Sequence, residues 1–243
     1  MGGAVVTTML NHRPVAVVAG AGPGNGKALA RRFAEAGYAV ALLARDQARV
    51  TALASEIPDA RGYACDVGDA RSVSAAFTNI RGDLGEVDVL LYNAGSGVFA
   101  DVETITPEQF EASWRVNAFG ALLCAKEAIP HMVERGKGDI VFIGATASRR
   151  GGANTAAFAP AKAAQRSLAE SMARKLWPKG VHVALVIVDG VVETPASRER
   201  MPDRPVEAFV SPVSLAETVY GLTIQDRRGW SFELEVRPFL EPW

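Results

Sequence analysis

The sequence has little cysteine, no long apolar run and no excess of charge of either sign. Its two cysteines, Cys65 and Cys124, form no motif, which excludes a disulfide framework and predicts a reducing, intracellular setting. The apolar runs have the length of strands, too short for a membrane span, and the first dozen residues lack the features of a signal peptide. A formal net charge of -1 gives no electrostatic reason to expect nucleic acid or an anionic membrane as a partner. We therefore expect a cytoplasmic protein without a metal site.

What the sequence does have is apolar residues, which occupy 49% of its 243 positions. That fraction allows a sizeable core, and the length fits one large α/β domain. No linker, internal repeat or low-complexity tract interrupts the chain. We therefore expect residues 1–243 to form a single domain, with a short N-terminal extension at residues 1–12.

The clearest functional signal lies near the start of the chain. Residues 15–19 form a valine-rich run typical of a buried parallel strand, and a helical period of apolar residues begins at Ala28. The turn between them contains Gly20, Gly22, Gly24, Asn25 and Gly26. A glycine turn between a strand and a helix lets the main chain approach a pyrophosphate at the helix N-terminus. The pattern predicts a nucleotide-binding site, and the alternative is an ordinary turn.

Strand and helix patterns alternate along the rest of the chain. Strands are predicted at residues 39–44, 60–65, 87–92, 139–144, 181–188 and 230–237, and helices at residues 46–56, 69–84, 106–135, 155–177 and 214–224. Repeated strand–helix units specify a parallel sheet with helices on both faces, and ligands bind such a sheet at the carboxyl ends of its strands. The segments that directly follow strands are Gly20–Gly26, Arg45, Asp66, Asn93–Gly95, Gly144–Ser148 and Asp189–Thr194. We expect the functional site to be built from them.

Several of these segments match one family in order and spacing. With Gly20-x-x-x-Gly24-x-Gly26, Asp66-Val67, Asn93-Ala94-Gly95 and Asn117, the chain resembles the short-chain dehydrogenase/reductase family from about Pro14 to Thr194. The resemblance implies a three-layer, doubly wound Rossmann fold with a mainly parallel seven-stranded sheet. It also implies a nicotinamide dinucleotide coenzyme and an oxidoreductase whose small-molecule substrate is a carbonyl compound or an alcohol.

The resemblance also assigns coenzyme contacts. It places Asp66 at the adenine with Val67 packing beside it, and Asn93, Ala94 and Gly95 under the adenine ribose. Lys162 would bind the nicotinamide ribose. The segment from Asp189 to Thr194 matches the family's Pro-Gly-x-x-x-Thr pattern, with Asp189 in place of proline. In it, Gly190 belongs to the expected coenzyme site and the Val192 main chain would bind the carboxamide. The Thr194 hydroxyl would reach the carboxamide or the pyrophosphate, or else cap a helix that begins at Pro195.

The end of the second strand bears on the choice of coenzyme. NAD-preferring enzymes usually place an acidic residue there for the ribose 2′-hydroxyl. This chain has Ala44 and then Arg45, whose guanidinium suits a 2′-phosphate. The sequence therefore favours NADP(H) over NAD(H). Two alternatives are an Arg45 that faces solvent, and an Asp46 that reaches the ribose instead of capping the next helix.

The catalytic positions depart from the family pattern. The family uses a serine after the fifth strand, then a tyrosine and a lysine four residues apart. Lys162 matches the lysine, whereas Phe158 stands at the tyrosine position and Ala145 at the serine position. A phenyl ring has no proton to give a developing alkoxide, and loss of a general acid costs about two to four orders of magnitude in rate. The chain is therefore identified as a divergent member without the catalytic serine and tyrosine.

Other polar residues remain near the expected site. The resemblance implies that Asn117 holds a water linked to Lys162, while the alternative for Asn117 is a helix-packing amide. Thr146 adjoins the serine position and is a possible proton donor. Further candidates are Ser148, Asn154, Asp189 and Glu193. Arg149 and Arg150 either hold an anionic substrate or face solvent.

Three functions follow from this pattern. The first is an NADP(H)-dependent oxidoreductase of altered mechanism, with water or a nearby hydroxyl as the proton source. The second is a catalytically silent NADP(H)-binding sensor or scaffold. The third is an enzyme that uses the fold for non-redox chemistry such as elimination. In the family, long helices like those from Thr106 and Thr155 form a dimer interface, so we expect a homodimer or a homotetramer. We also expect residues 195–211 to form a lid over the substrate pocket.

Overall fold

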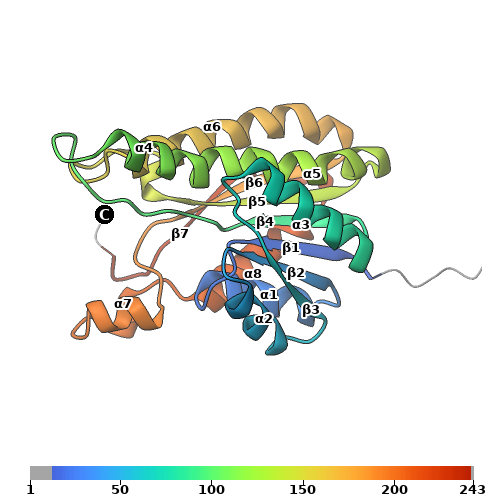
Figure 1. The fold of residues 1–243 in the computed structure, drawn as a ribbon, viewed down its shortest axis with the longest axis horizontal. Helices are drawn as coiled ribbons and strands as arrows, with labels where there is room; N and C mark the ends of the chain where they lie inside the picture. The colour runs from blue at the N-terminus through green and yellow to red at the C-terminus, as the bar shows by residue number, and fades with distance from the viewer. Residues whose placement is uncertain (1–12, 242–243) are drawn as a thin grey trace, which may run out of the picture.

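The computed structural model describes residues 13–241, and the extension expected at residues 1–12 lies outside them. Within the described range, seven parallel strands form one sheet in the order β3-β2-β1-β4-β5-β6-β7. The chain enters in the middle of the sheet, runs out to β3, and then crosses back over β1 to build the other half (Figure 1). The predicted doubly wound α/β fold is confirmed.

The elements alternate as expected. The strands are β1 (Val15–Ala19), β2 (Ala39–Ala44), β3 (Ala60–Ala64), β4 (Val87–Tyr92), β5 (Gly138–Ala145), β6 (Val181–Val188) and β7 (Glu233–Val236). The helices are α1 (Asn25–Glu35), α2 (Gln47–Ser55), α3 (Ala70–Asp83), α4 (Pro107–Trp114), α5 (Gly120–Arg135), α6 (Phe158–Leu176), α7 (Pro195–Arg200) and α8 (Pro212–Thr223).

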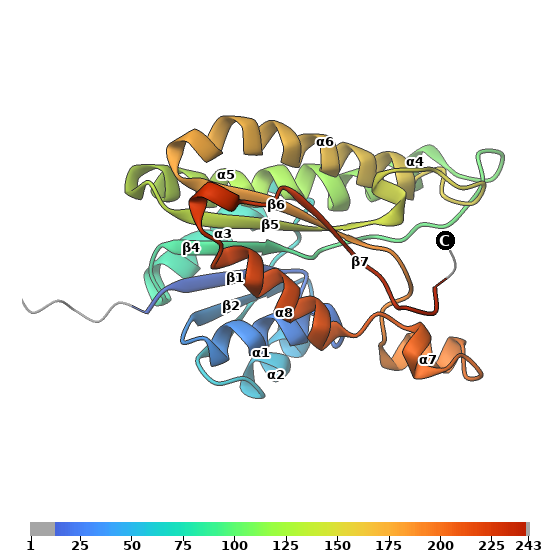
Figure 2. The ribbon, with the colours of Figure 1, turned by 180° about the vertical axis from the view of Figure 1, so that it is seen from behind.

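Helices cover both faces of the sheet, and each face has its own apolar core. Figure 1 shows α3, α4, α5 and α6 above the sheet and α1 and α2 below it, and Figure 2 shows α8 on the same lower side. Along β1, Val15, Val17 and Ala19 pack with the upper helices, while Ala16 and Val18 pack with the lower ones. This alternation is why the strand is apolar at every position.

Two helices differ from the prediction near the site. The helix expected at residues 155–177 begins at Phe158, because the Thr155 side chain is used in a turn with the main chain of Gly152. The helix expected at residues 106–135 starts at the predicted Thr106 capping box but contains a π-helical segment, Arg115–Phe119, between α4 and α5. Such segments widen a helix by one residue and are frequent at functional sites.

The described residues add two observations on the setting of the protein. Cys65 and Cys124 are both buried and form no disulfide bond in residues 13–241. No helix in residues 13–241 combines the length and apolar character that a membrane crossing requires.

Candidate functional site

Two adjoining cavities lie at the carboxyl ends of the strands. The first has a volume of about 860 Å³ and lies between the glycine turn, the end of β2 and the end of β3. The second, of about 610 Å³, lies between the end of β5, the start of α6 and the segment after β6. Asn93 and Gly95 line both, so the cavities are neighbours along this edge of the sheet. An elongated ligand could place one end in each cavity.

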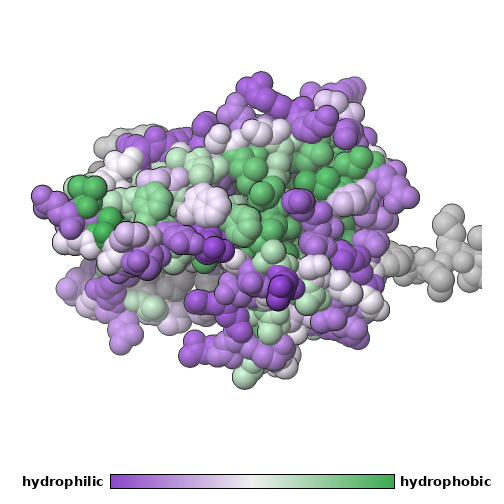
Figure 3. Space-filling view, turned by 45° about the horizontal axis from the view of Figure 1, so that its top comes forward, coloured by the Kyte–Doolittle hydropathy of each residue, from purple (hydrophilic) through white to green (hydrophobic). Residues whose placement is uncertain are grey.

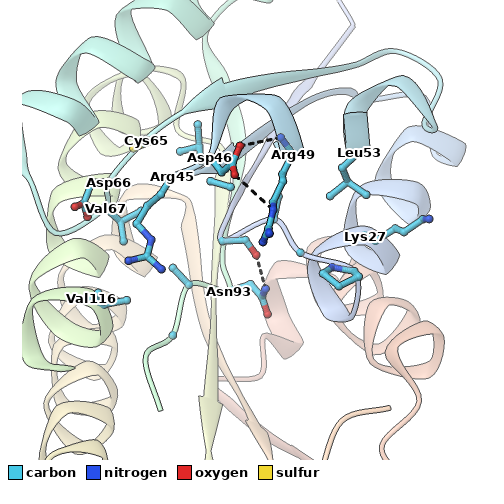
Figure 4. A pocket seen from close by; sticks show the side chains of 18 of the residues that line it. Lys27, Arg45, Asp46, Arg49, Leu53, Cys65, Asp66, Val67, Asn93 and Val116 are labelled. Carbon is cyan, nitrogen blue, oxygen red and sulfur yellow. Dashed lines mark hydrogen bonds and ion pairs between the residues drawn. The ribbon is translucent and has the colours of Figure 1, made fainter. Parts of the chain in front are cut away.

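The glycine turn after β1 forms one wall of the first cavity. Gly20 has φ = 90°, and a Cβ there would lie 2.4 Å from the main chain of Ala94. Asn93 fixes the turn by donating its side-chain amide to the Gly20 carbonyl at 2.7 Å (Figure 4). A Cβ at Gly22 would meet no atom within 4 Å, and Gly22 lines the cavity. Glycine therefore leaves open the space that a phosphate needs at the N-terminus of α1.

Gly24 and Gly26 play a different part in this turn. A Cβ at Gly26 would lie 2.8 Å from the Ala21 Cα, and one at Gly24 would lie 2.7 Å from the Thr194 methyl carbon. These two glycines permit close packing and do not line either cavity. Asn25 lines the second cavity, and its side-chain oxygen is buried without a hydrogen-bond partner in residues 13–241.

A cationic side chain stands at the far end of the first cavity. Arg45, directly after β2, makes no hydrogen bond or ion pair with any described residue, and Figure 4 shows it extending into the cavity. Asp46 caps α2, because its carboxylate accepts from the Arg49 main-chain N–H at 3.0 Å. The predicted cap is confirmed. The carboxylate beside Arg45 is thus already engaged with α2.

The other predicted coenzyme residues on this side also line the first cavity. They are Asp66, Val67, Ala94 and Gly95. One oxygen of Asp66 accepts from the Gly68 main-chain N–H at 2.9 Å, which orients the carboxylate after β3. Lys27 also lines this cavity but is paired with Glu56 at 2.5 Å.

Lys162 lies in the wall of the second cavity and is almost completely buried, at 4% exposure. Its ammonium donates to the Ile143 carbonyl at 2.9 Å and to the Gln165 side-chain oxygen at 3.2 Å. Burial disfavours the charged form and lowers the pKa of Lys162 to about 8. The group therefore titrates close to physiological pH.

Gln165 connects Lys162 to the π-helical segment. Its amide nitrogen donates to the Asn117 carbonyl at 2.9 Å. The Asn117 side chain donates to the carbonyls of Ser96 and Ser113, and its oxygen is buried without a described partner. The Asn117 oxygen and the Lys162 ammonium both lie beside Gly95. A Cβ built on Gly95 would be 3.5 Å from the Asn117 oxygen and 3.8 Å from the Lys162 nitrogen. The inward direction predicted for Asn117 is confirmed, and Gln165, three residues after Lys162 on the same helix, is a site residue that the sequence analysis did not single out.

Phe158 and Ala145 both line the second cavity and bring no polar side-chain group to it. The Phe158 ring packs against Phe99, with ring centroids 5.3 Å apart. Phe99 follows β4 and is 68% exposed. Nothing in the local sequence pattern places Phe99 over this cavity, so the sequence alone does not predict its position.

Of the polar candidates after β5 and β6, Thr146 lines the second cavity. Its hydroxyl donates to the carboxylate of Asp189, whose other oxygen lies 3.1 Å from the Arg237 guanidinium. Ser148 accepts from the Ala145 N–H and faces the turn. Neither Ser148 nor Asp189 lines a cavity, and the same is true of Asn154 and Glu193.

The segment after β6 supplies the last wall. Gly190 and Val192 line the second cavity, and Val192 forms a parallel bridge with Val210. The Thr194 hydroxyl accepts from the Ser197 N–H at 3.0 Å and caps α7, the alternative considered for this residue. Thr194 lines neither cavity.

The two arginines after β5 differ in their surroundings. Arg149 is paired with Glu233 at 2.8 Å and with Glu235, so it belongs to the β7 edge and lines neither cavity. Arg150 lines the second cavity, as does Arg200 at the end of α7. Arg200 lies within residues 195–211, the expected lid, and the sequence alone does not place it at this cavity.

Comparison with known proteins gives consistent matches. A family model described as short chain dehydrogenase matches residues 14–205. The chain is 30% identical over 201 residues to 2-dehydro-3-deoxy-L-rhamnonate dehydrogenase (NAD(+)) of Sphingomonas sp. strain SKA58, covering 82% of this chain and 80% of that one. It is 32% identical over 203 residues to a Xanthobacter autotrophicus protein described as inactive 2-(S)-hydroxypropyl-CoM dehydrogenase 2, covering 78% and 88%. A crystal structure of a metagenomic short-chain oxidoreductase in complex with NADP has a TM-score of 0.81 at 30% identity, covering 94% of this chain and 98% of that one.

Proposed function

This chain belongs to the short-chain dehydrogenase family of NAD(P)-dependent oxidoreductases, and from that premise we propose that it is an NADP(H)-dependent enzyme for a carbonyl or alcohol substrate with an atypical proton donor. The observation that carries the proposal is the pair of adjoining cavities, one lined by the unpaired side chain of Arg45 and the other by the buried Lys162. We propose that the whole chain acts as one coenzyme-binding domain.

The residues present fit a phosphorylated dinucleotide. The open space at Gly22 and the N-terminus of α1 suit the pyrophosphate, and Asn25, the first residue of that helix, lines the adjoining second cavity. Asp66 and Val67 would hold the adenine, and Arg45 would bind a 2′-phosphate. At the other end, the Val192 N–H, which has no described partner, would bind the carboxamide and Lys162 the ribose. When bound, the coenzyme supplies or accepts the hydride.

NADP(H) is preferred over NAD(H) because of the charges at the end of β2. A guanidinium without an acidic partner has its full hydrogen-bonding capacity for a phosphate. Asp46, the residue that would favour a free 2′-hydroxyl, is engaged in capping α2. The Sphingomonas relative is described with NAD(+), so this preference is a property to be tested on this chain itself.

We propose that the missing tyrosine proton comes from Lys162 through an ordered water. The lysine lines the cavity and has a pKa of about 8, so its ammonium is acidic enough to give up a proton near neutral pH. The Thr146 hydroxyl, which already donates to Asp189, keeps lone pairs that orient that water or a substrate hydroxyl. The unpartnered Asn117 oxygen offers a further acceptor for the same water.

The second candidate is a catalytically silent NADP(H)-binding sensor or scaffold. Phe158 and Ala145 favour it, because neither can contact a reacting oxygen through a polar side-chain group. The Xanthobacter relative described as inactive gives this alternative a parallel within the family.

The deciding experiment measures NADPH oxidation with a panel of aldehydes and ketones. We expect slow but measurable turnover by the native protein, and an increase of about 10²–10⁴ in the Phe158→Tyr variant, because a phenol restores the general acid. Phe158→Leu is the matched control and should not accelerate the reaction. Turnover confined to Phe158→Tyr would contradict the enzyme proposal and support the silent one.

We further propose a homodimer formed through the long helices, with a homotetramer as the larger alternative. Figure 3 shows apolar side chains gathered over the outer face of α4, α5 and α6. Phe110 and Trp114 are 43% and 41% exposed on this face. The unpaired cysteines favour a reducing compartment, for which we propose the cytoplasm.

A further inference from the structure

The second cavity has a distribution of charge that the coenzyme-binding role does not explain. Three cationic side chains line it, Lys162 at its buried end and Arg150 and Arg200 at its exposed mouth. No aspartate or glutamate is among its described lining residues. The two arginines come from different segments, the loop after β5 and the end of α7, so the tertiary structure brings them to one opening.

These two arginines are also without partners. In residues 13–241, four arginines have a side chain that makes no hydrogen bond, ion pair or ring contact with another described residue: Arg45, Arg71, Arg150 and Arg200. Three of the four line a cavity, and Arg71 lies on the exposed side of α3. Arginines close in sequence to Arg150 and Arg200 do have ion-pair partners: Arg149 is paired with Glu233, and Arg204 with Glu241.

Apolar side chains line much of the rest of the second cavity, beside the polar Asn25, Asn93, Thr146 and Thr155. Phe99 and Phe158 pack against each other on one side, and Val188 and Val191 line another. Phe99 is 68% exposed, a large apolar surface that a bound apolar group would cover. Three kinds of group therefore lie at different depths in the cavity: the Lys162 ammonium at the buried end, apolar side chains along the walls, and two guanidinium groups at the mouth.

We propose that the substrate is an oxo acid: a carbonyl compound with an apolar body, aromatic or alkyl, and an oxyanion that Arg150 and Arg200 bind. The carbonyl enters toward Lys162, and the carboxylate or phosphate stays at the mouth. Guanidinium groups favour oxyanions because they donate paired, charge-assisted hydrogen bonds. This inference rests on the proposed function, because it assigns the substrate class of the same site.

The test uses the full chain saturated with NADP⁺. The oxidised coenzyme has no hydride to give, so this complex can bind a ketone without reducing it. Calorimetry compares 4-oxo-4-phenylbutanoate with its methyl ester, which has the same carbonyl and ring but no charge. We expect the acid to bind about tenfold more tightly than the ester, with the difference shrinking as salt is raised. Phenacyl phosphate as a third ligand distinguishes the oxyanions, and the tighter of the two identifies the preferred group.

Variants assign the effect to the two arginines. Arg150→Gln and Arg200→Gln should each weaken the acid about three- to tenfold and leave the ester unchanged. Arg71→Gln is the matched control, because it removes an exposed, unpaired charge outside both cavities. All three side chains are exposed, so the fold should tolerate the substitutions.

Equal affinities for the acid and the ester would overturn the inference. It would also be overturned if the two variants weakened NADP⁺ binding and left the ratio of acid to ester unchanged, since the arginines would then hold the coenzyme. Titration with NADP⁺ alone tests the proposed function separately. A protein that fails to bind the coenzyme but still distinguishes the acid from the ester would contradict the proposed function and not the anion site.

Discussion

The Thr146 hydroxyl donates a hydrogen bond to the Asp189 carboxylate, joining the end of β5 to the end of β6. Arg237 holds the other carboxylate oxygen at 3.1 Å, so Asp189 has a cation on one side and a hydroxyl donor on the other. With its hydrogen directed at Asp189, Thr146 presents lone pairs to the cavity that it lines. The arrangement places an oriented acceptor one residue after Ala145, which stands at the serine position of the family pattern.

Replacement of Thr146 by valine tests this arrangement. Thr146→Val keeps the shape of the side chain and removes the oxygen, so we expect the kcat/KM of reduction to fall about 10²–10³-fold, as when one polar contact to a reacting group is lost. Coenzyme affinity should not change. Ser148→Ala is the control, because that hydroxyl faces the turn and not the cavity. Equal effects of the two variants would indicate a structural role for Thr146.

Arg45→Gln tests the coenzyme preference. Loss of the guanidinium should weaken NADPH about ten- to a hundredfold and leave NADH unchanged, because only NADPH carries the 2′-phosphate. Fluorescence titration of both coenzymes measures the ratio. Arg71→Gln should change neither affinity, and an Arg45 variant that lost both coenzymes equally would contradict the proposed contact.

The pKa of Lys162 predicts how the rate depends on pH. Burial lowers this pKa to about 8, and the proposed proton transfer from Lys162 needs the protonated ammonium. The rate of carbonyl reduction should therefore be constant below about pH 8 and fall as the pH rises through that value. Alcohol oxidation should show the opposite trend. A pH profile of kcat for the native protein tests this, and the break should be absent from Lys162→Met.

Tyr92→Phe tests the support of the π-helical segment. The buried Tyr92 hydroxyl donates to the Val116 carbonyl, and the variant leaves that carbonyl without its donor. We expect unfolding in urea to require about 1–3 kcal/mol less free energy. Because Asn117 lies next to Val116, activity should fall as well. Unchanged stability would show that the segment does not depend on this bond.

Trp114→Glu tests the assembly. We expect sedimentation equilibrium of the native protein to give at least twice the 25.7 kDa mass of one chain. A charge in the apolar face of α4 should dissociate it. Val213→Glu places the same charge at an exposed position of α8, outside that face, and should leave a dimer intact. A native protein that sediments as a monomer would contradict the proposal.

Local patterns in the sequence determined the order of the strands and helices and the local turns and caps. The glycine turn, the Asp46 cap and the Thr106 capping box depend on residues a few positions apart, so sequence alone predicts them. The alternation of strands and helices also placed Arg45 and Asp66 at one edge of the sheet, because parallel strands share that edge.

Only the tertiary structure decided what individual side chains contact. Arg149 and Arg150 are neighbours in the sequence, yet one is paired with β7 and the other lines a cavity. Lys162 bonds to the Ile143 carbonyl, and Arg150 and Arg200 line the same cavity although 50 positions of chain separate them. Such contacts depend on how distant elements pack and on where each side chain finds a partner, which no local periodicity specifies.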